Sequence, residues 1–232
     1  MEKKYELLKD DTIKVGVWCR TLYRIKALRD FGDVKAGDIG GYIEKEENLS
    51  HKGNCWVYGN AMVSDNAKVS GNAWVFDNAK VSDNAKVSGN AWVFDNAKVY
   101  DNAKVSGNAE VCGNARVYGN ARVYCNARVY GNAKVCGNAM VCGNAEVYGD
   151  AYISSNNDYA LVHGFGSENR TTTFFRLKDS DDIGVKCGCF YGTLNEFREK
   201  VKETHGSSPI AELYLDIADL MQKRFNYIPS KN

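Results

Sequence analysis

The sequence has almost no net charge and no long apolar segment. Its 232 residues contain 30 lysines and arginines against 29 aspartates and glutamates, which leaves a net charge of +1. Such a balance creates no overall field that would attract nucleic acid. No apolar run approaches the length of a membrane span, and the first residues, MEKKYELLKDD, lack the apolar region of a signal peptide. We therefore expect a cytoplasmic protein that makes no membrane contact.

Histidine, the side chain most often used as a general acid or base, is scarce. The chain has three, His51, His163 and His205, and none of them lies between residues 54 and 154. No combination of serine, histidine and aspartate with recognisable spacing accompanies them. We predict no catalytic residue and no cofactor, which argues against an enzyme.

What the sequence does have is a repeat with a period of six residues. Valine recurs at every sixth position from Val57 to Val147, and Ile153 closes the series. A small residue stands two places before each of them, first Cys55 and then alanine. The result is seventeen hexads of the general form small-x-Val-x-[Gly/Asp]-Asn.

Each hexad predicts one very short strand and one corner. Alternate side chains of a strand point to opposite faces, so the small residue and the valine share a face. The pair Gly/Asp-Asn is typical of turns, because these residues tolerate positive φ and form local hydrogen bonds. A single unit cannot bury its apolar face, but stacked coils bury a continuous column of valine and alanine.

The hexad resembles the repeat of left-handed parallel β-helices, with its aliphatic first position and small fifth position. This resemblance implies three hexads per triangular coil, and asparagine ladders at the corners. We therefore expect a mainly β protein: a left-handed parallel β-helix of five to six coils, with a small N-terminal β cap and a C-terminal α+β domain.

With three hexads per coil, residues eighteen apart form a column on one of three faces. The first face is aromatic over its first half. We predict an interaction surface there, formed by Trp56, Trp74, Trp92, Phe76 and Phe94. Three occupants remain open, namely another part of this chain, a second subunit, or a ligand that stacks on the rings.

The other two faces carry basic columns. The second face presents Lys80, Lys98, Arg116 and Lys134, and the third presents Lys68, Lys86, Lys104 and Arg122. Such columns suit a phosphate backbone, which makes nucleic-acid binding an alternative function. Aspartates at nearby corners, among them Asp65 and Asp83, neutralise much of that field, so we expect solvated surfaces.

The eight cysteines predict neither disulfides nor a metal site. Cys112, Cys136 and Cys142 take outward positions on three different faces, while Cys55 replaces an inward alanine. The segment 187–189 is a lone C-x-C without a second pair at ligand spacing. We expect reduced thiols.

Three segments follow from where the repeat starts and stops. Residues 1–53 are predicted to form a β cap, since the end of a solenoid must be covered. Its core candidates are Trp18, Leu22, Tyr23 and Ile25. Residues 54–154 are the β-helix, and residues 155–232 an α+β domain of three strands and two helices. The first helix opens at a capping box from Thr193 to Glu196. The second is expected to bury a stripe of Ile210, Leu213, Ile217, Leu220 and Met221.

A second resemblance lies just before the repeat. The run FGDVKAGDIGGYI at residues 31–43, followed by LSH at 49–51 and GNCWV at 53–57, resembles the YdcK-like group of uncharacterised β-helix proteins from bacteria and phages. It covers about residues 20–60 and the style of the repeat. It implies a bacterial or phage-infected cell as the setting.

A polar cluster after the repeat is a second candidate site. Ser167, Asn169, Arg170, Thr172, Arg176 and Lys186 would together hold an anion such as a nucleotide phosphate. Their spacing matches neither a Walker motif nor a dinucleotide fingerprint. A plain loop followed by a threonine-rich strand explains the same residues.

We expect first a non-catalytic binding protein, whose rod and C-terminal domain engage a protein partner, with a homodimer or homotrimer as one form. The phage side of the resemblance suggests a partner in a host defence complex, as for an anti-CRISPR protein. The alternative is an acyltransferase-like enzyme. Hexapeptide-repeat acyltransferases place a catalytic histidine near a subunit boundary, which here would be His51 or His163. A nucleic-acid or nucleotide binder is the third hypothesis.

Overall fold

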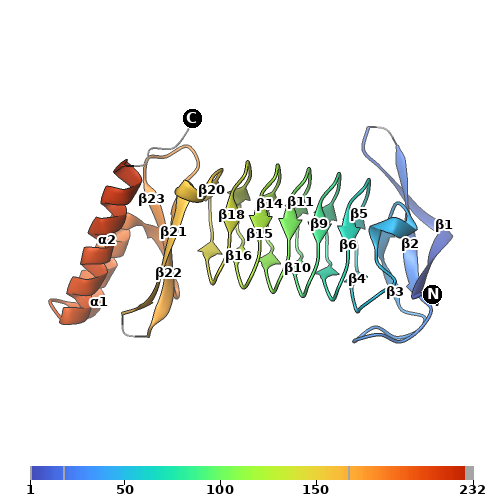
Figure 1. The fold of residues 1–232 in the computed structure, drawn as a ribbon, viewed down its shortest axis with the longest axis horizontal. Coiled ribbons are helices and arrows are strands. Elements are labelled where there is room, and N and C mark those ends of the chain that lie inside the picture. Colours follow the sequence, from blue (N-terminus) through green and yellow to red (C-terminus); the bar gives the residue numbers. More distant parts are fainter. Residues whose placement is uncertain (1, 18, 167, 228–232) are drawn as a thin grey trace.

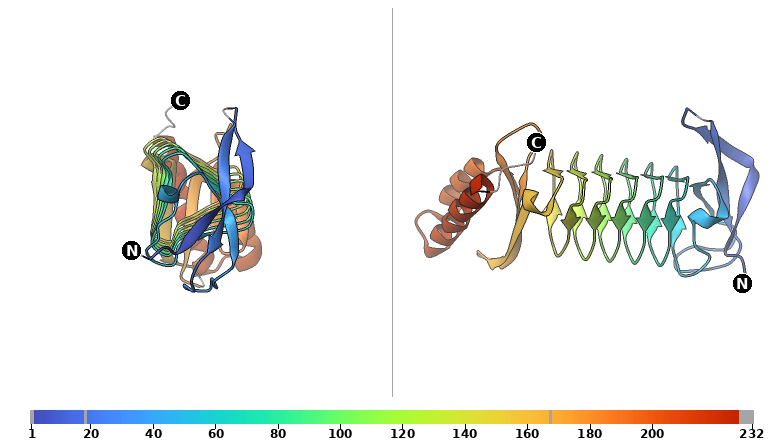
Figure 2. Two further views of the ribbon diagram at one scale, coloured as in Figure 1. Left: turned by 90° about the vertical axis from the view of Figure 1, so that its right-hand side faces the viewer. Right: turned by 45° about the horizontal axis from the view of Figure 1, so that its top comes forward.

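The protein is a straight rod with a different cap at each end, as seen in a computed structural model that describes residues 2–17, 19–166 and 168–227 (Figure 1). Coils of the rod superimpose when viewed along its axis (Figure 2, left). No helix among these residues is long and apolar enough to cross a membrane.

The rod is a parallel β-solenoid of about six turns, built from seventeen two-residue strands in three sheets. The first face consists of β4 (Trp56–Val57), β7 (Trp74–Val75), β10 (Trp92–Val93), β13 (Glu110–Val111), β16 (Arg128–Val129) and β19 (Glu146–Val147). The second consists of β5 (Met62–Val63), β8 (Lys80–Val81), β11 (Lys98–Val99), β14 (Arg116–Val117), β17 (Lys134–Val135) and β20 (Tyr152–Ile153). The third consists of β6 (Lys68–Val69), β9 (Lys86–Val87), β12 (Lys104–Val105), β15 (Arg122–Val123) and β18 (Met140–Val141). The predicted fold class is confirmed, while the handedness stays a prediction of the resemblance.

The register explains why the period is so strict. Residues eighteen apart pair in parallel, as Trp74 does with Trp92 and Val75 with Val93. From Ala61 to Val147, every hexad alanine and valine is at most 1% exposed, so the core is one column of small and branched side chains. Burial of this column is the main source of stability, because no coil buries its apolar face alone.

The corners repeat two devices. The residue before each asparagine has positive φ, +70° at Gly89 and +57° at Asp83. The asparagines form the predicted ladders: Asn72 Nδ2 donates to Asn90 Oδ1 at 3.1 Å, and Asn90 Nδ2 to Asn108 Oδ1 at 3.0 Å. Each amide therefore satisfies its neighbour in the next coil.

The N-terminal cap continues the second face. Strands β1 (Tyr5–Val15) and β2 (Arg20–Ala27) pair antiparallel, β2 pairs with β3 (Ile39–Ile43), and β3 joins β5 in parallel. A short 3-10 helix, η1 (Glu46–Asn48), follows. Of the predicted core residues, Leu22 and Ile25 are fully buried and Tyr23 is half-buried. Trp18 lies outside the described residues.

A buried lysine closes the open end of the first coil. Lys4 Nζ donates to the carbonyl oxygen of Cys55 at 2.8 Å and to that of Gly53 at 3.3 Å, and its side chain is fully buried. Burial lowers the pKa of Lys4, since the charged form loses its hydration. Carbonyl groups that no further coil can pair are thus satisfied.

The C-terminal domain adds a sheet and two helices beyond the last coil. A 3-10 helix, η2 (Asn156–Asp158), leads into β21 (Tyr159–Phe165), β22 (Arg170–Arg176), β23 (Ile183–Cys187) and β24 (Phe190–Thr193). The expectation of three strands is wrong. The run 183–193 turns back on itself at Gly188, whose φ is +56°, so it forms a hairpin instead of one strand.

Helices α1 (Leu194–His205) and α2 (Pro209–Tyr227) cover the far side of this sheet (Figure 1). The capping box is confirmed, since Thr193 Oγ1 accepts from the Glu196 backbone N–H at 3.3 Å. The predicted α2 stripe is wrong for Leu213 and Leu220, which are 47% and 59% exposed, whereas Met221 is buried and Ile210 and Ile217 pack partly buried against the core. The helix instead buries Ala211, Tyr214, Ala218, Met221 and Phe225. Two small alanines allow close approach to the sheet, which outweighs the greater hydrophobicity of the leucines.

Candidate functional site

The first face divides into a covered start and an open middle. Trp56 is 1% exposed, because the Phe31 and Tyr5 rings of the N-terminal cap lie 5.3 and 6.2 Å from it. The prediction that Trp56 belongs to an exposed interaction surface is therefore wrong. At Trp56 the first face is covered by another part of the same chain, which is one of the three alternatives that the sequence left open.

The next two coils of this face have no such cover. Trp92 is 48% exposed, and Trp74, Phe76 and Phe94 are half-buried. Phe76 and Phe94 stack with their centroids 4.8 Å apart and their planes parallel within 1°, and Trp92 meets Phe76 edge-on at 6.1 Å. We call these four residues the aromatic patch. Trp74 pairs with Trp56, so the patch begins in the coil next to the one that the N-terminal cap covers.

The far end of the same face is covered by the C-terminal sheet. The Tyr148 ring lies 4.6 Å from that of Tyr191 on β24, and the Glu146 backbone N–H donates to Thr173 Oγ1 at 3.0 Å. Both ends of the Trp56 column are thus used for capping. In the neighbouring column Tyr58 of the first coil is 53% exposed, so aromatic exposure on this face begins at Tyr58 and continues into the middle of the rod.

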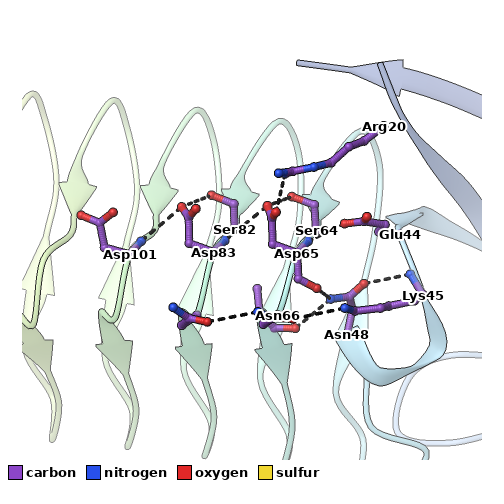
Figure 3. Close-up of polar contacts among 12 residues, drawn as sticks. Arg20, Glu44, Lys45, Asn48, Ser64, Asp65, Asn66, Ser82, Asp83 and Asp101 are labelled. Atoms are coloured by element: carbon purple, nitrogen blue, oxygen red, sulfur yellow. Dashed lines mark hydrogen bonds and ion pairs between the residues drawn. The ribbon is translucent and has the colours of Figure 1, made fainter. Parts of the chain in front are cut away.

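The basic columns lie where the sequence predicted them. Lys80, Lys98 and Arg116 pair in register along the second face and are exposed. Beside them runs an acidic ladder at the corner, in which Asp65, Asp83 and Asp101 follow one another (Figure 3). Opposite charges therefore alternate across this edge, as expected for a solvated surface.

The carboxylates of this ladder serve the backbone. The Asp83 N–H donates to Asp65 Oδ2 at 3.4 Å, and the Asp101 N–H to Asp83 Oδ2 at 3.3 Å (Figure 3). Arg20 of β2 forms an ion pair with Asp65 at 2.5 Å, while the Asp65 N–H donates to Glu44 at 2.5 Å. This end of the ladder joins the cap to the rod, a structural role.

The six residues of the predicted anion site do not converge. Side chains alternate along a strand, so Thr173 and Phe175 of β22 face the solenoid while Thr172 and Phe174 face the helices. Lys186, paired with Thr173, faces the solenoid and lies 3.8 Å from Glu146. Arg170 and Lys186 therefore lie on opposite faces of the sheet.

The other members of that set are used elsewhere. Thr172 Oγ1 donates to Cys187 Sγ at 3.1 Å, and Arg176 Nη2 donates to the Phe225 carbonyl at 2.8 Å. Asn169 is exposed with φ of +48° in the β21–β22 turn. Ser167 lies outside the described residues. The prediction of a single anion cradle is therefore corrected, and of these residues Arg170 borders the cavity described below.

The three histidines all lie in the caps. His51 Nδ1 accepts from the Lys4 backbone N–H at 3.1 Å, and its ring stacks on Tyr5 at 4.4 Å. His163 is exposed on β21, with Nδ1 2.9 Å from Thr171 Oγ1. His205 ends α1 and stacks on Tyr214 at 5.7 Å. They lie on different elements, so they form no shared site.

The eight cysteines are free thiols. Within the described ranges, no three His, Cys, Asp or Glu side chains come together in a way that would hold a metal ion. The sequence reasoning missed the cavity beside Arg170. The relevant signal was Phe190 following the Cys-Gly-Cys turn, since its ring lies 5.5 Å from that of Phe197 on α1.

The geometry defines a parallel β-solenoid closed by two unlike caps. A family model described as the YdcK beta solenoid repeat matches residues 109–125 and 115–131. A protein of Escherichia coli (strain K12), named "Uncharacterized acetyltransferase YdcK", is 42% identical over 55 residues, which are 21% of this chain and 17% of that protein. The chain thus covers less than a fifth of this curated relative. The solenoid of the present chain is YdcK-like, as its sequence predicted.

Proposed function

We propose that this chain is a non-catalytic binding protein that docks a protein partner on its aromatic patch. The observation that carries the proposal is the exposure of the aromatic patch, in which Trp92 is 48% exposed and Trp74, Phe76 and Phe94 are half-buried. Exposed apolar patches with a polar surround are typical of interaction surfaces.

The patch has the physical character of a binding hot spot. Trp and Tyr are enriched among residues that dominate binding energy. The strands beneath the patch are hydrogen-bonded on both sides, as where the Trp74 N–H donates to Ala91 and the Trp92 N–H to Ala109, both at 2.9 Å. A rigid, flat surface of this kind loses little conformational entropy when a partner docks.

The test compares two double variants on adjacent faces. Trp74→Ser/Trp92→Ser removes the patch, while Lys80→Ser/Lys98→Ser changes the equivalent strand positions on the second face. Each protein is measured by size-exclusion chromatography with light scattering, and is then used as bait in cells of its source. Thermal unfolding confirms that both variants remain folded.

We expect the tryptophan double variant to lose an association that wild type and the lysine double variant retain. If wild type is an oligomer and only the tryptophan variant is a monomer, the partner is a second copy. If wild type is a monomer, the partner is a different protein that only the tryptophan variant fails to retain. Identical behaviour of all three proteins would contradict the proposal.

An acyltransferase-like activity is the second candidate, favoured by the name of the Escherichia coli relative. His51 packs within the cap, so His163 is the better base, since it is exposed beside Thr171. This candidate predicts binding of acetyl-CoA by calorimetry and loss of turnover in His163→Ala. Absence of acetyl-CoA binding would exclude it.

Two further hypotheses stay predictions. A host defence complex remains one class of partner for the patch, and it rests on the phage side of the resemblance alone. Nucleic-acid binding through the basic columns predicts a steep salt dependence and its loss in Lys80→Glu/Lys98→Glu.

A further inference from the structure

A cavity of about 570 Å³ lies in the C-terminal domain. It is bordered by the β23–β24 turn, the β21–β22 turn and the C-terminal end of α1. Four aromatic rings line it, those of Phe190, Tyr191, Phe197 and Tyr214, and Phe197 lies 5.5 Å from Phe190 and 5.8 Å from Tyr214. Small-molecule sites have volumes of about 300–1,000 Å³ and mostly apolar walls with a few polar groups, so this cavity has the size and lining of one.

The polar groups around the cavity are mainly basic. Arg170 lines it from the start of β22, Lys200 and His205 line it from α1, and Glu168 is the single acidic residue of the lining. Glu168 lies 3.8 Å from Arg170 and Glu203 lies 2.8 Å from Lys200, and all four side chains are more than half exposed, so water screens both ion pairs. Gly188 lets Arg170 approach the turn, since a Cβ there would lie 2.7 Å from Arg170 Nη1.

We infer that this cavity binds a planar aromatic anion of the mononucleotide class. The half-buried ring of Phe190 offers a stacking surface for a base, a contact that tolerates different bases, while the buried Tyr214 supports the wall of the cavity. The guanidinium of Arg170 and the ammonium of Lys200 offer charge-assisted hydrogen bonds to a phosphate. This site lies in the C-terminal domain, whereas the proposed protein interface lies on the rod, so neither depends on the other.

The experiment is isothermal titration of the full chain with ATP and with adenosine. A charge-reversal pair, Arg170→Glu/Lys200→Glu, tests the rim of the cavity. Its matched control is Lys202→Glu/Lys223→Glu, which makes the same change of charge at exposed positions of α1 and α2 outside the cavity. Phe190→Ala tests the stacking surface, and thermal unfolding of each variant confirms that it is folded.

We expect saturable ATP binding by wild type and by the control pair, and at least about tenfold weaker binding by the charge-reversal pair. Phe190→Ala should weaken ATP binding by roughly tenfold, as loss of one stacking ring does. Adenosine should bind more weakly than ATP. The inference is overturned if wild type binds no ATP, if adenosine binds as tightly, or if both pairs behave alike.

Discussion

Trp56 and Trp92 occupy the same strand position in the same column, yet their surroundings differ completely. Trp56 is 1% exposed beneath Phe31, whereas Trp92 is 48% exposed. We expect Trp56→Ala to lower the free energy of unfolding by about 3–5 kcal/mol, because it opens a cavity under the cap. Trp92→Ala should change it by less than about 0.5 kcal/mol. Urea unfolding followed by circular dichroism measures both, and equal losses would contradict the cap's role.

Cys112 makes the stability of the rod sensitive to alkaline pH. Burial, and then the carboxylates of Asp95 and Glu110, raise the pKa of its thiol from 9.0 to about 11. Above pH 9 the unfolded chain releases this proton while the folded chain still holds it. The stabilisation is therefore complete below pH 9 and is lost as the pH rises toward 11. Between pH 8 and 11, the melting temperature of Cys112→Ser should fall less than that of wild type. Cys125→Ser, an exposed corner thiol, is the control and should follow wild type.

At the scale of elements, the stability of α1 depends on its N-cap residue, Thr193. Thr193 Oγ1 accepts from the Glu196 N–H, and Glu196 Oε2 accepts from the Thr193 N–H at 2.7 Å. Thr193→Ala removes the bond from the Glu196 N–H to the hydroxyl and the bond that the hydroxyl donates to Glu196 Oε2 at 2.9 Å, while the backbone N–H of residue 193 keeps its bond to Glu196. We expect a loss of about 1 kcal/mol in the free energy of unfolding. Thr193→Ser keeps the hydroxyl and should retain most of the stability. Chemical denaturation measures the free energy of unfolding of the two variants. An equal loss in both would show that the methyl group of Thr193, and not its hydroxyl, stabilises the helix.

Elements of the repeat were predictable from the sequence because one local rule fixes each strand, its inward side chains and its corner. Elements of the caps were less predictable, because packing between segments distant in sequence determines which of several apolar faces is buried. In α2, the leucines favoured one stripe, but the sheet accepts the face with Ala211 and Ala218. The segment 183–193 read as one strand, since the turn depends on the conformation of Gly188.

At the scale of the whole molecule, the sequence placed the aromatic column correctly but not what covers it. Cover over Trp56 comes from Tyr5 and Phe31, which lie in no repeat and carry no periodic signal. The anion cluster failed for a related reason. Neighbours in sequence such as Arg170 and Thr173 point to opposite faces of one sheet, and only the tertiary structure shows which face meets a cavity. Exposure of the aromatic patch therefore had to be read from the structure.

The solenoid also predicts how the molecule responds to changes of length. Deletion of residues 91–108 removes one whole coil and joins Asn90 to Ala109, so every later residue keeps its column. The rod should shorten by about 4.8 Å, the spacing of neighbouring strands, with both caps in their present orientation. Deletion of residues 91–96 instead moves Lys98 into the column of Trp74 and shifts the C-terminal domain by one face.

The two deletions differ in which outward side chains become neighbours. In both, the inward alanines and valines of the remaining hexads stay buried. Nearest-neighbour contacts between coils set the stability of a solenoid. Both deletions remove Trp92 and Phe94, but the longer one places Glu110 and Cys112 beside Trp74 and Phe76, whereas the shorter one places Lys98 and Tyr100 there and so keeps an aromatic pair. We therefore expect the six-residue deletion, which also removes fewer coil contacts, to have the higher urea midpoint. Small-angle X-ray scattering should show the shorter rod for the eighteen-residue deletion. A lower midpoint for the six-residue deletion would mean that keeping every residue in its own column matters more for stability than the contacts between individual outward side chains.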